Sequence, residues 1–184
     1  AGEYNHKGES VVYGDTDSVY FTAHKTLKKE IDQGVIPWTK DSVVALYDRI
    51  SDEVNGSFKA FMTKAFHTPS TRGEVIAAGR ELVASKGLFI TKKRYAVLYY
   101  DKEGKRADVE GKEGKMKAMG LDLKRSDTPV FVQDFLSDLL YMVLTGHTEK
   151  QVLEKISEFR AEFKARPGWE KGSPKRANNM TKYT

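Results

Sequence analysis

Apolar positions follow a strand-like pattern at the start of the chain and a helical one soon after. In Glu9–Phe21, β-branched and aromatic residues flank a Gly-Asp-Thr-Asp corner, a pattern typical of a β-hairpin with an acidic tip. From Val43 to Ala65 apolar residues recur at helical spacing, and Thr39 or Asp41 is placed to cap the helix. The first third of the chain therefore predicts a hairpin followed by a long helix.

A β-rich stretch follows between residues 74 and 109. Its apolar runs are short and separated by polar breaks, which favours several strands: Glu74–Gly79, Leu82–Val83, Gly87–Ile90 and Tyr95–Asp101. Asp-Lys-Glu-Gly at residues 101–104 predicts a turn that returns the chain into a partner strand at Lys105–Val109. This stretch therefore predicts an antiparallel sheet.

The last third of the chain is helical in pattern. Pro129 is predicted at the first helical position, after Thr128, and Gly146 ends that helix. A capping box opens a second helix at Thr148, and Pro167 ends it. Because the link is short, the two helices form an antiparallel helical hairpin.

Together these elements predict an α+β fold. Residues 1–122 form an antiparallel sheet with a packed helix, and residues 123–184 form a helical portion. No internal repeat or low-complexity segment interrupts this division.

Composition narrows the class of protein. The chain is 39% hydrophobic and 31% charged, values typical of a soluble globular protein, and it has no cysteine. No apolar run approaches the roughly 20 residues that cross a bilayer, and no signal-peptide pattern is present. We therefore expect a cytoplasmic protein with no membrane partner. The start at Ala1 without Met and the basic C-terminus indicate a fragment of a longer protein.

The formal net charge of +5 is modest, but the positive charge is clustered. Local clusters of Lys and Arg favour a polyanionic partner. They occur in three places: Lys92 to Arg94, a group of Lys115, Lys117, Lys124 and Arg125, and the C-terminal segment from Lys164 to Lys182.

Asp15 and Asp17 are the candidate metal ligands. Residues two apart on a strand face the same way, so their carboxylates are expected to converge on one divalent cation that prefers oxygen ligands. The alternative is an ordinary turn, where Asp is common because its side chain bonds nearby backbone N–H groups. An EF-hand fits badly, because Val19 and Tyr20 stand where an oxygen ligand and a glycine are needed.

Thr91-Lys-Lys-Arg-Tyr95 is the candidate nucleic-acid contact. On a strand, Lys93 and Tyr95 would share one face and Lys92 and Arg94 the other, and such cations meet phosphate groups. The alternative is an edge strand whose lysines protect it against aggregation.

These motifs, in this order, resemble those of the family B DNA polymerases, and most closely the T-even-type bacteriophage enzymes. Tyr13-Gly-Asp-Thr-Asp-Ser18 resembles the palm motif, and Lys92-Lys-Arg-Tyr95 resembles the Lys-Lys-Arg-Tyr motif. Residues 117–129 resemble the palm-to-thumb passage and residues 177–183 a later thumb segment. The resemblance implies that residues 1–122 are the C-terminal part of the palm and residues 123–184 the start of the thumb.

The resemblance also implies a chemistry. It is two-metal phosphoryl transfer with Mg²⁺, in which a primer 3′ end is extended by dNTPs. Asp17 would bind the metal directly, Asp15 would support the charge of the site, and Glu74 would be an auxiliary acid.

Primer–template DNA is the implied partner. Lys93 and Tyr95 would lie against the primer strand near its 3′ end. The remaining implied DNA contacts are polar or basic: Lys92, Arg94, Lys124, Arg125, Asn178 and Lys182.

The resemblance further implies what the chain lacks. The other palm aspartate, the fingers and the exonuclease carboxylates belong to a missing N-terminal polymerase portion, so we expect the chain alone to be inactive. Two alternatives remain. A non-catalytic nucleic-acid-binding module explains the basic clusters but not the paired aspartates. A glycosyltransferase that uses Asp-x-Asp to hold a nucleotide-sugar metal complex predicts a parallel sheet.

Overall fold

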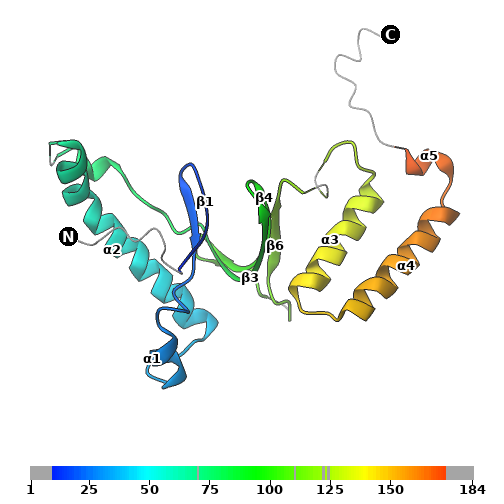
Figure 1. Ribbon diagram of the computed structural model, residues 1–184, viewed down its shortest axis with the longest axis horizontal. Helices are drawn as coiled ribbons and strands as arrows, with labels where there is room; N and C mark the ends of the chain where they lie inside the picture. Colours follow the sequence, from blue (N-terminus) through cyan, green and yellow to red (C-terminus); the bar gives the residue numbers. More distant parts are fainter. Residues whose placement is uncertain (1–9, 70, 110, 122, 124, 173–184) are drawn as a thin grey trace, which may run out of the picture. The chain divides into compact units, whose positions relative to one another are not determined.

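Helices and antiparallel strands form a mixed α+β fold, as predicted (Figure 1). The structure is a computed structural model that describes residues 10–69, 71–109, 111–121, 123 and 125–172. The chain divides into two compact units. The first comprises the described residues up to Val83 together with Tyr100–Asp108, and the second comprises Ala84–Tyr99 and the described residues from Val109 on. The boundary near residue 122, between palm and thumb, stays a prediction.

The acidic hairpin forms as predicted. Strand β1, Val11–Asp15, pairs antiparallel with β2, Ser18–Phe21, so that the last residue of β1 lies opposite the first residue of β2. Thr16 and Asp17 form the two-residue turn, and Thr16 has a φ of 42°. Positive φ at a central turn residue matches the twist of a tight hairpin.

Two helices follow in the first unit. The five-residue α1, Lys28–Asp32, was not predicted, whereas the long α2, Lys40–Phe66, was. Thr39 caps α2 through a capping box with Ser42, which confirms one of the two predicted caps. The helix ends at His67, which adopts the left-handed conformation with a φ of 52°.

The strand predicted over Glu74–Gly79 is wrong. The chain forms a 3₁₀ turn, η1, at Gly73–Val75 and then runs without regular structure beside α2. Asn55 on α2 donates to the carbonyl oxygen of Ala78 at 2.9 Å and accepts from the Ala78 N–H at 2.7 Å. A helix side chain thus satisfies the backbone groups that a strand would pair with its neighbour.

The core of the first unit includes a buried ion pair. Val43, Val83 and Tyr100 form an apolar cluster. Asp101 is only 2% exposed, and Arg80 donates to its carboxylate at 2.6 Å and also to Asp48. Sequence reasoning placed Asp101 in a turn and did not find this pairing.

The remaining strands are β3, Leu82–Thr91; β4, Arg94–Lys102; β5, Lys105–Arg106; and β6, Lys115–Met119. Strand β3 replaces two predicted short strands, and β5 is shorter than predicted. In the first unit β4 pairs antiparallel with β5 across the predicted turn at residues 101–104. In the second unit β4 pairs antiparallel with β6, with Tyr95 opposite Met119.

Helices α3, Val130–Leu144, and α4, Glu149–Ala165, form the predicted helical hairpin. Pro129 precedes the first residue of α3 instead of occupying it, while Gly146, with a φ of 83°, follows its end as expected. Thr148 and its capping box open α4 as predicted. A short helix α5, Gly168–Lys171, follows.

Two apolar clusters hold the second unit together. Ala96 and Leu98 of β4 are buried against Leu144 of α3. Between α3 and α4 the rings of Phe135 and Phe159 stack with centroids 3.7 Å apart. Within the described part of the chain, no helix combines the length and the apolar character needed to cross a membrane.

Candidate functional site

The acidic corner of the first unit exposes its two carboxylates differently. Asp15 ends β1 and is half-buried, whereas Asp17 lies in the turn and is exposed. Thr16 Oγ1 donates to Asp15 Oδ1 at 3.2 Å, and Ser18 Oγ donates to the Asp15 carbonyl oxygen at 3.2 Å. The expectation that both aspartates occupy one strand face is wrong, because Asp17 lies in the turn.

The donor chemistry of this corner suits a hard divalent cation, but it is incomplete. Two carboxylates supply oxygen ligands of the right kind, while Mg²⁺ and Ca²⁺ take six or more ligands. Among the residues that the structure describes, no group of three His, Cys, Asp or Glu is arranged to hold a metal ion. Glu74 lies in η1, and its side chain lies outside the part of the molecule that the structure describes.

The basic motif of the second unit forms a turn. Lys92 and Lys93 join β3 to β4, both are exposed, and Lys93 has a φ of 61°. The expectation that residues 92–95 alternate between two faces of one strand is therefore wrong. Only Arg94 and Tyr95 belong to β4. The physical reason is that two long antiparallel strands meet here, and they need a two-residue reversal.

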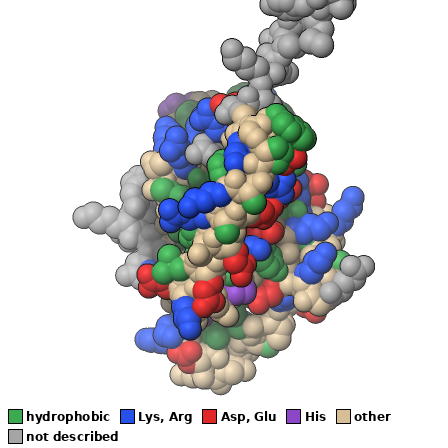
Figure 2. Space-filling view, turned by 90° about the vertical axis from the view of Figure 1, so that its right-hand side faces the viewer, with side chains coloured by type: hydrophobic (Ala, Val, Ile, Leu, Met, Phe, Trp, Pro, Cys, Tyr) green, Lys and Arg blue, Asp and Glu red, His purple; other side chains and the backbone are tan. Residues whose placement is uncertain are grey.

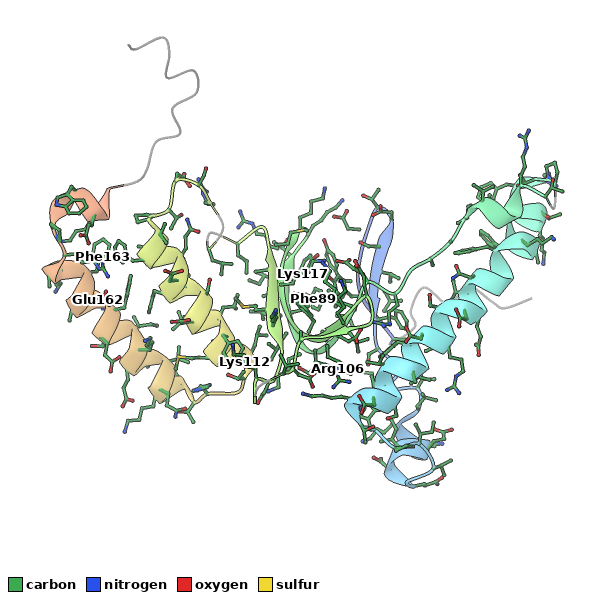
Figure 3. All side chains as sticks on the ribbon, turned by 180° about the vertical axis from the view of Figure 1, so that it is seen from behind. Phe89, Arg106, Lys112, Lys117, Glu162 and Phe163 are labelled. Carbon is green, nitrogen blue, oxygen red and sulfur yellow. The ribbon has the colours of Figure 1, made fainter. Side chains whose placement is uncertain are left out.

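Tyr95 contributes to the packing of the sheet. The residue is 5% exposed, and its ring stacks on Phe89 of β3 with centroids 5.6 Å apart and an interplanar angle of 26°. Phe89 is labelled in Figure 3. Such stacking positions the start of β4 directly after the basic turn. Contact between Tyr95 and DNA stays a prediction.

Gly120, which sequence reasoning missed, lies against the basic turn. It follows β6, has a φ of 66°, and any side chain there would overlap the Lys93 carbonyl oxygen. The available signal was a glycine at the end of a short apolar run, which also fits an ordinary loop.

The DNA contacts predicted after residue 122 are described only in part. Arg125 Nε and Nη2 donate to the two carboxylate oxygens of Asp127 at 2.9 and 2.8 Å. This hydrogen bonding holds the pKa of Asp127 below its usual value. Lys124, Asn178 and Lys182 lie outside the described residues.

Helix α4 carries both signs of charge among its described residues. Figure 2 shows Lys and Arg side chains interspersed with Asp and Glu on the side of the molecule where α4 lies. In sequence, α4 likewise mixes both signs, for example Lys155 beside Glu154 and Arg160 near Glu162. Mixed charge of this kind attracts a phosphate backbone weakly.

A second charged cluster lies in the first unit around Asp108. Arg106 binds both oxygens of this carboxylate at 2.8 Å, and Lys40 Nζ lies 2.8 Å from Oδ2. The hydrogen bonds from Arg106 and Lys40 hold the pKa of Asp108 well below its usual range. Arg106 also pairs with Asp41, so two cations face two carboxylates. Because these charges are matched, we assign the cluster a role in the fold.

Comparison with known protein families gives a match over the β-rich and helical parts of the chain. Residues 71–167 match the model of DNA polymerase family B. The matched region contains Glu74, the basic turn and Arg125, and it excludes the acidic hairpin.

Three curated relatives extend this finding. A DNA-directed DNA polymerase of Escherichia phage RB69 is 31% identical over 148 residues, which cover 75% of this chain and 16% of the relative. The DNA-directed DNA polymerase of Enterobacteria phage T4 is 26% identical over 182 residues, covering 94% and 20%. DNA polymerase 037L of Invertebrate iridescent virus 6 is 26% identical over 152 residues, covering 82% and 11%.

The match to the T4 enzyme covers 94% of this chain, so fewer residues lie outside it than precede Asp15. Asp15 and Asp17 therefore lie within the matched region. The chain spans at most about one fifth of the length of these relatives.

Proposed function

We propose that this chain, which belongs to the family B DNA polymerases, supplies the C-terminal part of the palm and the start of the thumb to a DNA-directed DNA polymerase. In this proposal residues 1–122 are palm and residues 123–184 are thumb. The observation that carries it is the acidic hairpin tip, because a nucleic-acid-binding surface alone gives no reason for paired carboxylates that repel phosphate.

The acidic corner would hold part of a Mg²⁺ site. Bound Mg²⁺ would favour ionisation of the primer 3′ hydroxyl and neutralise the pyrophosphate leaving group. Asp17, exposed in the turn, would bind the metal, and the Asp15 carboxylate would add negative charge beside it. Thr16 Oγ1 donates to Asp15 and so restricts the orientation of that carboxylate. Glu74 would act as an auxiliary acid.

The basic turn would bind the primer strand. Lys92, Lys93 and Arg94 are exposed at the junction of β3 and β4. Lysine and arginine contacts to phosphates supply most of the sequence-independent affinity for DNA. Tyr95, Lys124, Arg125, Asn178 and Lys182 complete the proposed set of DNA contacts.

The surface of the hairpin supports a role as one portion of a larger enzyme. Large apolar side chains of β1 and β2 are exposed, an arrangement that favours burial by a partner segment. They are Val11 at 61%, Val12 at 51%, Val19 at 55% and Phe21 at 38%. We propose that the remaining portion of the polymerase covers them and supplies the other palm aspartate, the fingers and the dNTP site.

The test is Asp17→Asn in the assembled polymerase. We expect kcat for primer extension to fall about 100-fold or more, the loss typical when charge stabilisation is removed from a transition state. Affinity for primer–template DNA should be retained, because asparagine keeps the size of the turn residue. Asp52→Asn, at an exposed position on α2, is the matched control and should leave kcat unchanged.

Two results would contradict the proposal. Primer extension by the 184-residue chain alone, with Mg²⁺ and dNTPs, would show that the remaining portion is unnecessary. Unchanged kcat in Asp17→Asn would favour the second candidate, a non-catalytic nucleic-acid-binding module, for which the exposed basic turn is the supporting observation.

A further inference from the structure

We infer that Gly120 is a positioning residue for DNA binding, because it sets the backbone path of the basic turn at Lys92–Lys93. The inference rests on the proposed function of that turn and adds to it a residue that touches no DNA itself. It is carried by the backbone geometry at two positions that lie far apart in sequence.

The first observation is the close approach of the two backbones. An ideal Cβ on Gly120 would overlap the Lys93 carbonyl oxygen, and it would lie 3.0 Å from the Lys93 carbonyl carbon and 3.1 Å from Arg94 Cγ. The nearest atoms are mainly backbone, which cannot move aside as a flexible side chain does. Among the twenty standard residues, only glycine therefore permits this approach.

The second observation is the sheet register. Strand β6 pairs with β4 so that Met119 lies opposite Tyr95. This pairing brings Gly120, the next residue, beside the end of the turn. The stacked rings of Tyr95 and Phe89 fix the neighbouring strand ends. Gly120 is thus held against Lys93 from the β6 side, and the turn has little freedom to shift.

The third observation is the strained conformation at Lys93 itself. Its φ of 61° is uncommon for a residue with a side chain, and surrounding structure must maintain it. That conformation determines the direction in which the Lys93 ammonium group leaves the turn. If the contact with Gly120 sets this direction, a side chain at position 120 should displace Lys93 and weaken its phosphate contact.

The experiment measures binding of a fluorescein-labelled primer–template duplex by the full 184-residue chain across a series of salt concentrations. We expect Gly120→Ala to weaken binding about fivefold to tenfold at 0.1 M salt and to lower the salt slope by about one, as loss of one phosphate contact predicts. Lys93→Ala should do the same. The double variant should bind no more weakly than Lys93→Ala alone, because both changes remove one contact.

Gly111→Ala is the matched control. Gly111 lies in the same unit with a φ of 76°, and a Cβ there meets nothing within 4 Å. This variant carries the same backbone strain without the overlap, so it should lose stability but keep both affinity and salt slope. A further variant places d-alanine at position 120 by protein ligation. Its methyl group takes the other α-hydrogen position and favours positive φ, so this variant should fold and bind like the unmodified chain.

The outcomes separate the inference from the proposed function. If Lys93→Ala weakens binding but Gly120→Ala behaves like Gly111→Ala, the inference is overturned and the proposed DNA contact stands. If the d-alanine variant binds as weakly as Gly120→Ala, the overlap with Lys93 is not the cause and the inference is also overturned. If Lys93→Ala leaves affinity and slope unchanged, the proposed DNA contact fails, and the inferred role of Gly120 fails with it.

Discussion

Tyr100 lies between an apolar core and a cluster of charges. Its side chain is 4% exposed and packs with Val43 and Val83. Lys40 Nζ lies 5.5 Å and Arg106 Cζ 5.6 Å from the centroid of its ring. Burial, followed by the influence of Tyr47, raises the pKa of Tyr100 to about 12 from its ordinary value of 10.0. The neutral phenol is therefore the form that the fold requires.

This shift predicts an alkaline limit to stability. The pKa of Tyr100 is higher in the folded chain than in the unfolded chain. The contribution of its neutral phenol to the free energy of unfolding is therefore fully present below pH 10.0 and is lost as the pH rises through about 12. Titration followed by tyrosinate absorbance should show a step near pH 12 that belongs to Tyr100. Tyr100→Phe should remove that step. An unchanged titration curve near pH 12 in Tyr100→Phe would contradict the assignment.

At the scale of elements, local signals in the sequence predicted most of the helices. The capping boxes at Thr39 and Thr148 and the glycine after α3 act through residues within one turn of the helix. The sequence also predicted the acidic hairpin, because β-branched runs flank a short corner of turn residues. Such features need no knowledge of distant parts of the chain.

The features that sequence reasoning missed depend on distant residues. The Glu74–Gly79 segment has strand-like composition, but Asn55 on α2 takes up the backbone groups of Ala78. Lys93 carries no turn signal, and Gly120, whose backbone lies against it, comes after three further strands in the sequence. At the candidate site, the sequence therefore predicted the residue types and the acidic hairpin turn. It missed the turn that holds Lys93 and wrongly gave Asp15 and Asp17 one strand face.

The helical hairpin depends on its aromatic interface. The ring of Phe159 on α4 stacks on Phe135 and lies 5.9 Å from Phe131, both on α3, and 6.2 Å from Phe163 (centroid distances; Figure 3 labels Phe163). Phe159→Ala should lower the free energy of unfolding by about 3 kcal/mol, within the range for truncating a packed phenylalanine.

Urea unfolding measures this loss. Phe66→Ala is the control, because that ring is 64% exposed at the end of α2 and its truncation should cost less than about 1 kcal/mol. Equal losses in the two variants would show that the stacked rings contribute no more than a surface phenylalanine.

At the scale of the whole molecule, the chain corresponds to a small share of its relatives. It covers 16% of the RB69 polymerase and 20% of the T4 polymerase. In the proposed function the acidic corner supplies two carboxylates, and within the described residues no third ligand joins them. The proposal therefore predicts that catalysis depends on association with the remaining portion of the polymerase, and association follows mass action.

The last prediction concerns that association. Adding the chain to the remaining portion of its polymerase should restore primer extension, and the rate should rise with chain concentration and then saturate. The Asp17→Asn chain keeps the exposed apolar residues of β1 and β2, so it should bind the same partner without restoring activity. An equal mixture of the two chains, at saturation, should therefore give about half the rate.

If the mixture instead gives the full rate, either Asp17 is dispensable or the Asp17→Asn chain does not assemble. Assaying Asp17→Asn alone with the partner distinguishes these cases, because a dispensable Asp17 restores the full rate and failed assembly restores none.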